Sequence, residues 1–332
     1  MKNVLVTGGG GFIGLGIVRA LAKTGVRTVV VGRHRYPAVE EAGALCLVGD
    51  IRDRDFMVRA CNNIDTVFHV AAKAGVWGRW HDYFSINVKG TENVLAACRH
   101  NQVANLVYTS TPSVVFNRGH LRGVDESAPY ADNVLCHYAR SKIMAEILVL
   151  QANSPQLRTT ALRPHLVWGP GDTNLIPRLL ARGRAGSLRI VGDGRNKVDI
   201  SYIDNVVDAH IQAANNLEHF GTAAGEAFFI SQGEPVRLWE WINDLFMQLA
   251  MPPVARSISF NKAYRLGFVM EKLYGLLAVK SEPRMTRFLA EQLAKSHWFS
   301  IAKARRILPY EPRVSTEEGM RRLVTWVRGG GL

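Results

Sequence analysis

The sequence predicts an α/β protein with a doubly wound parallel sheet, followed by a smaller, mainly helical C-terminal region. Through the first half of the 332 residues, short β-branched runs alternate with amphipathic helical patterns, as in a parallel sheet with helices on both faces. A glycine-rich turn joins the first strand to the first helix, and the pattern becomes irregular after WGPGD (168–172). We therefore expect one domain over residues 1–170, rejoined by about 197–232, and a second region over 171–332.

Each element of this plan follows from a local pattern. Apolar and β-branched runs predict strands at 3–7, 28–31, 44–48, 66–70, 106–110 and 159–163. Amphipathic spacing predicts helices at 12–23, 54–61, 83–100 and 138–151. Beyond Asp172 we expect a helix at 175–184, a strand near 188–191 and a return to the sheet at 199–203. From about Glu234 the chain looks mainly helical and more basic.

Composition limits the classes of partner. The net charge is +13, which suits nucleic acid, an anionic membrane surface or acidic ligands, or is simply a solvated basic surface. No basic stretch accompanies a nucleic-acid-binding module, so we expect no nucleic-acid partner. The four cysteines form no Cys-x-x-Cys pair, and no cluster has metal-ligand spacing. We expect free thiols in a reducing compartment, a cytoplasmic location and no metal site.

The glycine turn predicts a phosphate-binding site. In TGGGGFIG, Gly8, Gly11 and Gly14, with Phe12 and Ile13 between the last two, follow a strand and begin a helix. Residues without a Cβ let backbone N–H groups and the positive helix end approach a pyrophosphate. This is the Rossmann-type arrangement for a dinucleotide. A merely tight turn is the alternative.

The end of the second strand bears on the choice of dinucleotide. An NAD-binding protein would place an acid there to hold the ribose 2′-hydroxyl. Here Gly32 takes that position and Arg33 follows, which suits a 2′-phosphate. We therefore expect NADP(H), with NAD(H) left open; the alternative is that Arg33 faces solvent.

A Tyr-x-x-x-Lys pair predicts the chemistry. Tyr138 and Lys142 are four residues apart on a predicted helix, so they share one face. A neighbouring ammonium favours the phenolate, so we expect a Tyr138 pKa below its usual value near 10. Thr111, just past the fifth strand, is a candidate hydrogen-bond donor to a substrate carbonyl, and Ser110 is the alternative because a one-residue shift reverses the strand face.

Taken together, TGGGGFIG, YTST, the Tyr138–Lys142 pair, NVKGT (87–91) and GDGRNKVDISYIDN resemble the extended short-chain dehydrogenase/reductase superfamily. Within it the chain resembles the 3β-hydroxysteroid dehydrogenase-like branch. The runs HVAAKAGVWG, YTSTPSV and YEPRVSTEEGM are most similar to 2-alkyl-3-oxoalkanoate reductases and decarboxylating 4-carboxysterol 3-dehydrogenases.

This resemblance implies roles for individual residues. Tyr138 would be the general acid and base, Lys142 would bind the nicotinamide ribose, Thr111 would orient the carbonyl, and Asn87 would support the catalytic network. The remaining implied cofactor contacts are Asp50 and Ile51 beside adenine, Ala71, Ala72 and Lys73 along the groove, and Pro164 to Val167 at the carboxamide.

We therefore expect an NADPH-dependent oxidoreductase that reduces a hydrophobic β-keto acid or reversibly oxidises a 3β-hydroxysteroid-like alcohol. Pro112 and Ser113 stand where dehydratases of the superfamily have an Asp-Glu pair, which disfavours dehydration. The alternatives are a sugar-nucleotide epimerase with tightly held NAD and a non-catalytic dinucleotide sensor.

The remaining expectations concern the substrate and larger partners. A basic residue of the loop KAGVWGRWHDYF, namely Lys73, Arg79 or His81, would receive a substrate carboxylate, and Ser113 would also contact the substrate. The apolar segment 264–279, bordered by cations, predicts a peripheral membrane contact, although ordinary core helix would show the same pattern. We also expect a homodimer.

Overall fold

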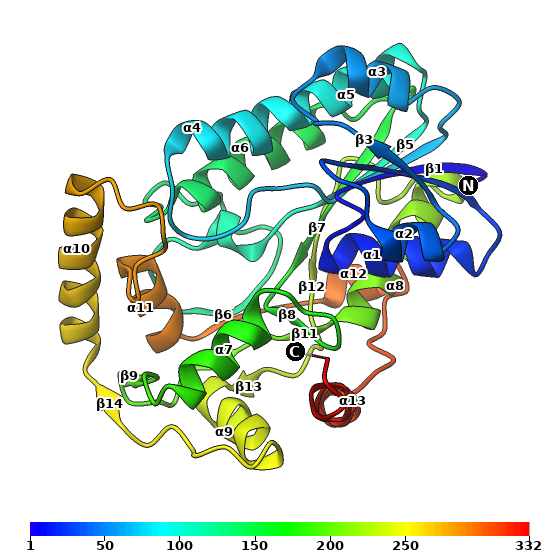
Figure 1. Cartoon of the computed structure of the whole chain (residues 1–332). Helices are drawn as coiled ribbons and strands as arrows, with labels where there is room; N and C mark the ends of the chain where they lie inside the picture. Colours follow the sequence, from blue (N-terminus) through cyan, green and yellow to red (C-terminus); the bar gives the residue numbers. More distant parts are fainter. Residues whose placement is uncertain (332) are drawn as a thin grey trace.

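The computed structural model describes residues 1–331 and centres on a seven-stranded, all-parallel sheet (Figure 1). The strand order is β12-β7-β5-β4-β1-β2-β3, so the order reverses between β1 and β4. This confirms the predicted doubly wound sheet. The strands are β1 (Asn3–Thr7), β2 (Arg27–Gly32), β3 (Leu45–Val48), β4 (Thr66–His69), β5 (Asn105–Thr109), β7 (Arg158–Pro164) and β12 (Ala227–Ile230).

Helices cover both faces because successive strand residues point to opposite sides. Val4 and Val6 pack in the layer of α1 and α8, whereas Leu5 packs in the layer of α3, α5 and α6. Figure 1 shows the second group above the sheet and the first below it. The helices are α1 (Phe12–Ala22), α2 (Pro37–Glu41), α3 (Arg54–Ala60), α4 (Trp80–Tyr83), α5 (Gly90–His100), α6 (His137–Gln151) and α8 (Ile203–His219).

The predicted helix over 83–100 is a composite. Four α-helical residues are followed by a π-helical turn, Phe84–Lys89, which runs directly into α5. A π-turn adds one residue to the turn and redirects the side chains that follow it. This local change places Asn87 inside the protein.

The predicted return to the sheet at 199–203 is wrong. Ser201 and Tyr202 form β11, which pairs with β8 (Val167–Trp168) outside the main sheet. The returning strand is β12, which pairs with β7. The apolar run AFFI of β12 is fully buried, whereas the Ser201 hydroxyl is used to bond the His165 carbonyl at 2.7 Å.

A second, four-stranded sheet that the sequence did not reveal has the order β13-β10-β15-β6. Its strands are β6 (Leu121–Val124), β10 (Lys197–Val198), β13 (Val236–Arg237) and β15 (His297–Phe299). The short strands β9 (Ile190–Val191) and β14 (Ser257–Ile258) pair with each other. The C-terminal helices are α7 (Leu175–Arg184), α9 (Leu238–Gln248), α10 (Phe260–Leu276), α11 (Arg287–Ala294), α12 (Ala302–Ile307) and α13 (Thr316–Arg328).

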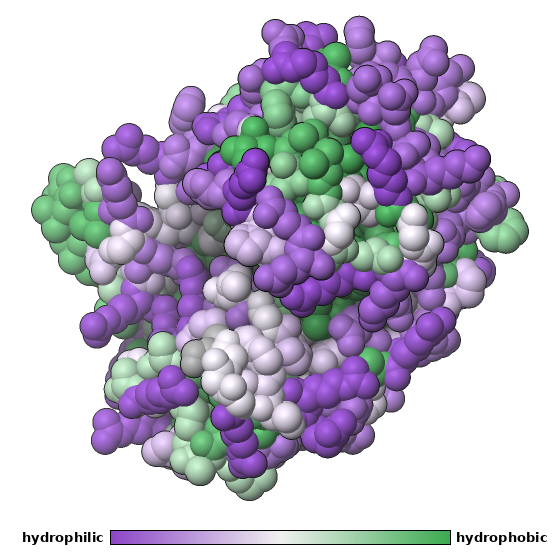
Figure 2. All heavy atoms as spheres, turned by 45° about the vertical axis from the view of Figure 1, so that its right-hand side comes forward, coloured by the Kyte–Doolittle hydropathy of each residue, from purple (hydrophilic) through white to green (hydrophobic). Residues whose placement is uncertain are grey.

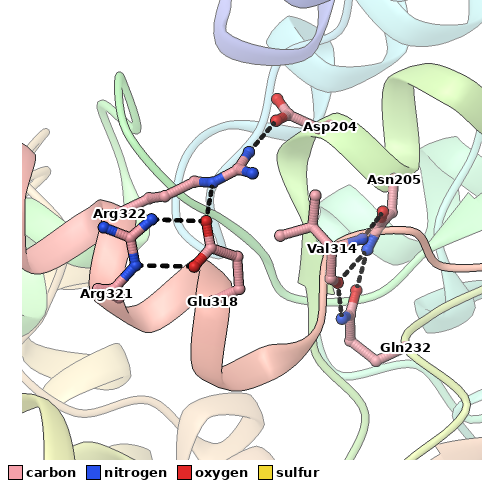
Figure 3. Close-up of polar contacts among 7 residues, drawn as sticks. All are labelled: Asp204, Asn205, Gln232, Val314, Glu318, Arg321 and Arg322. Atoms are coloured by element: carbon pink, nitrogen blue, oxygen red, sulfur yellow. Dashed lines mark hydrogen bonds and ion pairs between the residues drawn. The ribbon is translucent and has the colours of Figure 1, made fainter.

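The C-terminal segment is tied back to the start of α8 (Figure 3). The Asn205 side chain accepts from the Val314 N–H at 3.0 Å and donates to its carbonyl at 2.8 Å. Arg322 on α13 bonds both Glu318 at 2.7 Å and Asp204 at 3.2 Å. Two of the segments that carry the family resemblance therefore bind each other.

No helix among residues 1–331 is long and apolar enough to cross a membrane. Within the same residues, no three His, Cys, Asp or Glu side chains gather as metal ligands would.

Candidate active site

A cavity of about 600 Å³ lies at the carboxyl ends of the parallel strands, where folds of this kind bind ligands. The fold brings all the expected cofactor residues except His165, and both candidate hydroxyl residues, to its wall. These lining residues are Gly8, Gly11, Phe12, Ile13, Gly14, Arg33, Asp50, Ile51, Ala71, Ala72, Lys73, Ser110, Thr111, Tyr138, Lys142, Pro164 and Val167.

The glycine turn leaves no room for side chains. Gly8 has φ +70°, and a Cβ built there would lie 2.8 Å from the Ala71 Cα. A Cβ on Gly14 would lie 2.3 Å from the Gly8 carbonyl oxygen. Gly11 precedes the first residue of α1, and no side chain caps this helix end. The free N–H groups of α1 therefore face the cavity as an anion site.

The adenosine end of the cavity is basic. Arg33 follows the last residue of β2, is exposed and lines the cavity. Asp50 also lines it, but its carboxylate is held by Arg52 through contacts of 3.0 and 2.6 Å. The Arg52 hydrogen bond, with a further contribution from the charge of Arg33, holds the pKa of Asp50 below its usual value. The acid at this end is thus already neutralised by a guanidinium.

Lys142 is a buried residue of the cavity wall. Its Nζ donates to the Thr109 carbonyl oxygen at 2.6 Å and lies 4.1 Å from the centre of the Tyr108 ring. Burial lowers the pKa of Lys142 to about 7, although the carboxylate of Glu146, one turn later, opposes this shift. The ammonium is positioned by a strand carbonyl and an aromatic face, and its charge is costly in this surrounding.

Tyr138 lies on the same face of α6, as its spacing from Lys142 predicts. The expected low pKa is wrong for this geometry, because burial raises the pKa of Tyr138 to about 12, while a hydrogen bond with Thr111 opposes the rise. The phenol therefore holds its proton at neutral pH. A protonated phenol is the form that donates a proton to a developing alkoxide.

The two candidate hydroxyls differ in their partners. Thr111 lies close enough to Tyr138 to oppose the rise of its pKa on burial, and its oxygen lies 3.2 Å from both the backbone nitrogen and the hydroxyl oxygen of Ser113. The Ser110 hydroxyl is buried and makes no hydrogen bond within residues 1–331. Ser113, expected at the substrate, supports Thr111 and is outside both site cavities.

Asn87 connects the cofactor loop to the catalytic helix. Its side chain accepts from the Lys73 N–H at 2.7 Å and donates to the Lys73 carbonyl at 3.1 Å. It also donates to Ser141 at 2.8 Å, and the Ser141 hydroxyl donates to the Tyr138 carbonyl at 2.8 Å. Asn87 does not line the cavity, so it can act only through these neighbours.

A buried hydrogen-bond chain continues from Asn87 to the first strand. The Thr91 hydroxyl donates to the backbone carbonyl oxygen of Asn87 at 2.6 Å, and the same hydroxyl lies 2.9 Å from His69 Nε2. The other ring nitrogen of His69 meets the Thr7 hydroxyl at 2.7 Å. Burial lowers the pKa of His69 to about 3, so the ring is neutral. No sequence motif pointed to His69 as part of this chain of hydrogen bonds.

A second cavity of about 1300 Å³ lies beside the first, between α6 and α10. Lys73 lines both cavities, and Arg79 lines the second. His81 is directed away from them, with its side chain 85% exposed. Arg140, which the sequence analysis missed, lines the second cavity and stacks on the Trp80 ring at 4.7 Å.

Several other wall residues were also missed. Tyr36 covers the glycine turn, and Asp172 accepts from the backbone N–H groups of Asn174, Leu175 and Ile176, which fixes the start of α7. Their only sequence signal is proximity to the motifs GRHRY and WGPGD.

Comparison with known proteins agrees with this geometry. Residues 5–260 match the model of the 3-beta hydroxysteroid dehydrogenase/isomerase family. The chain is 47% identical to the 2-alkyl-3-oxoalkanoate reductase of Stenotrophomonas maltophilia, covering 97% of this chain and 98% of the relative. It is 30% identical to the decarboxylating sterol-4-alpha-carboxylate 3-dehydrogenase of Mus musculus, covering 97% and 90%.

Solved structures give the same fold. MoeE5, solved in complex with UDP-glucose and NAD, superposes with a TM-score of 0.77 at 27% identity, covering 99% of each chain. A UDP-glucose 4-epimerase from Thermotoga maritima reaches 0.77 at 23% identity, again covering 99% of each chain. At this lower identity the likeness concerns the fold alone.

Proposed function

Because the chain belongs to the 3β-hydroxysteroid dehydrogenase/isomerase family, and is thus an NAD(P)-dependent oxidoreductase, we propose that it reduces the 3-oxo group of 2-alkyl-3-oxoalkanoates with NADPH. One observation carries the proposal: Tyr138, Thr111 and Lys142 lie in the wall of a dinucleotide-sized cavity that adjoins a larger one through Lys73. Identities of 47% and 44% to two 2-alkyl-3-oxoalkanoate reductases support this substrate class.

The glycine turn, Arg33 and Lys142 would hold the dinucleotide, which when bound would supply a hydride to the carbonyl carbon. Tyr138 donates its phenolic proton to the carbonyl oxygen as negative charge develops there, and Thr111 holds that oxygen by a hydrogen bond. Lys142, one turn along the same face of α6, would bind the nicotinamide ribose, and its charge would lower the cost of the phenolate that remains. The neutral Tyr138 of the free protein is in the correct state for reduction.

The preference for NADPH is part of the proposal. It is supported by Gly32 at the end of β2, by exposed Arg33 beside the adenosine end, and by the engagement of Asp50 with Arg52. A 2′-phosphate would meet guanidinium groups and no unpaired carboxylate in this region.

Lys73 is the proposed partner of the substrate carboxylate. Both named relatives act on compounds whose carboxylate is one carbon removed from the oxo or hydroxyl carbon, according to their names. A carboxylate so close to the reacting carbon must lie near the junction of the two cavities, where Lys73 Nζ is only loosely paired with Asp82 at 3.9 Å. Arg79 is further into the second cavity and is the alternative partner.

The test is a turnover assay with NADPH and NADH against 2-alkyl-3-oxoalkanoates, 3-ketosteroids and UDP-sugars. We expect reduction of the oxo acids with NADPH. Turnover of a UDP-sugar with NAD that survives purification would establish an epimerase instead. Cofactor binding without turnover of any compound would establish a sensor.

We also propose a cytoplasmic homodimer that touches a membrane surface. The four free thiols support the reducing compartment. Light scattering on the purified protein tests the dimer: a mass near 36.8 kDa would show a monomer.

A further inference from the structure

Helix α10 has two different faces. One face of the helix lines the second cavity through Glu271, Lys272, Tyr274 and Gly275, and the chain continues along this cavity from Ala278 to Lys280. Earlier in the helix, Gly267 packs against α11, since a Cβ there would lie 2.5 Å from the Thr286 backbone. Figure 1 shows α10 at the left edge of the molecule, beside α11.

The outer side of α10 carries an exposed apolar stripe. Its members repeat at intervals of three or four residues, so they lie along one side of the helix. The apolar stripe consists of Leu266, Val269, Leu273, Leu276 and Leu277. Leu276 and Leu277 are 83% and 70% exposed, and Figure 2 shows a hydrophobic cluster at the left edge of that view, over α10.

The charges around the stripe have one sign. The exposed charged side chains between residues 260 and 280 are Lys262, Arg265, Lys272 and Lys280. Lys272 and Lys280 also line the second cavity, so they stand between the stripe and that cavity. The single acid of α10, Glu271, is half-buried. Its carboxylate accepts from the backbone N–H and from the guanidinium of Arg287, each at 2.7 Å. An apolar stripe bordered only by cations is complementary to an anionic lipid surface.

We propose that the apolar stripe of α10 docks on an anionic lipid surface, so that a long-chain substrate passes from the lipid into the second cavity beneath the helix. The inference rests on the proposed function for its substrate, but the docking itself does not require turnover. A second copy of the chain is a poorer occupant, because pairing the two stripes would bring four cations against four others.

The helix is long enough for this contact. Its 17 residues span roughly 25 Å at about 1.5 Å per residue, and the stripe extends from the second turn to the end. Such a helix lies in the interface with its apolar side below the headgroups.

The experiment is flotation of the full chain with vesicles of phosphatidylcholine, with and without about a third phosphatidylglycerol. We expect binding to the anionic vesicles at low salt and release at high salt. Leu273→Gln with Leu276→Gln should weaken binding at least tenfold, through loss of apolar insertion. Lys262→Glu with Arg265→Glu should weaken it by a similar factor at low salt.

Two matched variants serve as controls. Phe220→Gln with Met247→Gln removes equally exposed apolar side chains elsewhere, and Lys23→Glu with Arg59→Glu reverses two exposed cations outside α10. Both should bind as the unmodified protein does. None of these eight residues lines either site cavity, so reduction of a short-chain, freely soluble oxo acid should persist in every variant.

Three outcomes would overturn the docking surface. The first is that the protein does not float with either kind of vesicle, and the second is that the control variants lose as much binding as the stripe variants. The third is that the stripe substitutions leave flotation unchanged and alter only the mass measured by light scattering. The last would show contact between two copies. Failure of the oxo-acid assay with normal flotation would instead refute the proposed function and leave the surface intact.

Discussion

The side-chain amide of Asn87 and the backbone of Lys73 exchange two hydrogen bonds, of 2.7 and 3.1 Å, so one amide satisfies both polar groups of one peptide residue. The π-helical turn places Asn87 where this is possible. Lys73 borders both cavities, and the same amide reaches Ser141 on the catalytic helix. The loop that carries the proposed carboxylate partner and the helix that carries the proposed acid are held by one residue.

Asn87→Asp tests that connection. A carboxylate still accepts from the Lys73 N–H, but it cannot donate to the Lys73 carbonyl or to Ser141, and it faces their oxygens. We expect kcat to fall about tenfold or more while KM for NADPH changes little. Asn101→Asp, which also removes donors to two backbone carbonyls but far from the cavities, should leave kcat unchanged. Equal losses in both variants would indicate general destabilisation.

Tyr138→Phe should reduce kcat by about 10²–10⁴-fold, because it removes the proton donor. Cofactor affinity, measured by NADPH fluorescence, should stay within a factor of two or so, since the ring remains. Tyr264→Phe, outside both site cavities, is the matched control. More than a tenth of the original activity in Tyr138→Phe would exclude it as the acid.

Arg33→Ala should lower kcat/KM for NADPH about tenfold or more and leave that for NADH nearly unchanged, because a charge-assisted contact to the 2′-phosphate is lost. Arg35→Ala removes a guanidinium that is 79% exposed and pairs with Glu40, and it should change neither. An acid introduced by Gly32→Asp would be the opposite change, toward NADH. It is not a clean test, since a Cβ at this position would lie 2.4 Å from the Tyr36 ring. Equal use of both cofactors by the unmodified protein would remove the basis for the NADPH preference.

Stability should depend on pH through Lys142. Its pKa is about 7 in the folded protein and 10.5 ordinarily, so between these values the unfolded chain binds a proton that the folded protein does not. The free energy of unfolding should therefore rise with pH in this window, by up to about 1.4 kcal/mol per pH unit.

Lys142→Met should remove that slope in urea denaturation at pH 7.5, 8.5 and 9.5. Lys89→Met, at an exposed position, should retain it. If the difference in stability between Lys142→Met and the unmodified protein is constant across these pH values, the ammonium is not destabilised by burial.

Lys73→Met should abolish discrimination between a 2-alkyl-3-oxo acid and its methyl ester. The unmodified protein should prefer the acid by about tenfold or more, the worth of a charge-assisted contact. Arg79→Ala tests the alternative partner in the same assay. Equal reduction of acid and ester by the unmodified protein would mean that no carboxylate partner exists.

The cofactor cavity could be anticipated from sequence because its parts are local motifs at strand ends, and a parallel sheet brings all strand ends to one edge. Gly8, Thr111 and Tyr138 each follow or begin a recognisable element. The second cavity could not be anticipated from sequence. Arg140 and Tyr274 both line it, and they do so only because α10 packs against the sheet domain. The Tyr138 pKa was misjudged for a related reason: burial is a property of the whole fold, and spacing reports only the neighbouring charge.

The small sheet was missed because its strands are two to four residues long and pair across large separations. Short runs such as LRGV and HWF have no period that distinguishes them from loop. The strand β12 shows the same limit, since its apolar run identifies a buried element but not the neighbour that it joins.

Strand β6 pairs with β15, for example Leu121 with His297. The polypeptide therefore crosses from one sheet to the other and back. No single cut between these strands divides the molecule into two halves that each keep their own hydrogen-bonded partners. A fragment ending near residue 170 would lose β12 from the main sheet and leave β6 unpaired. Proteolytic nicking in the intervening loops should yield pieces that remain associated, and the two sheets should melt as one cooperative unit.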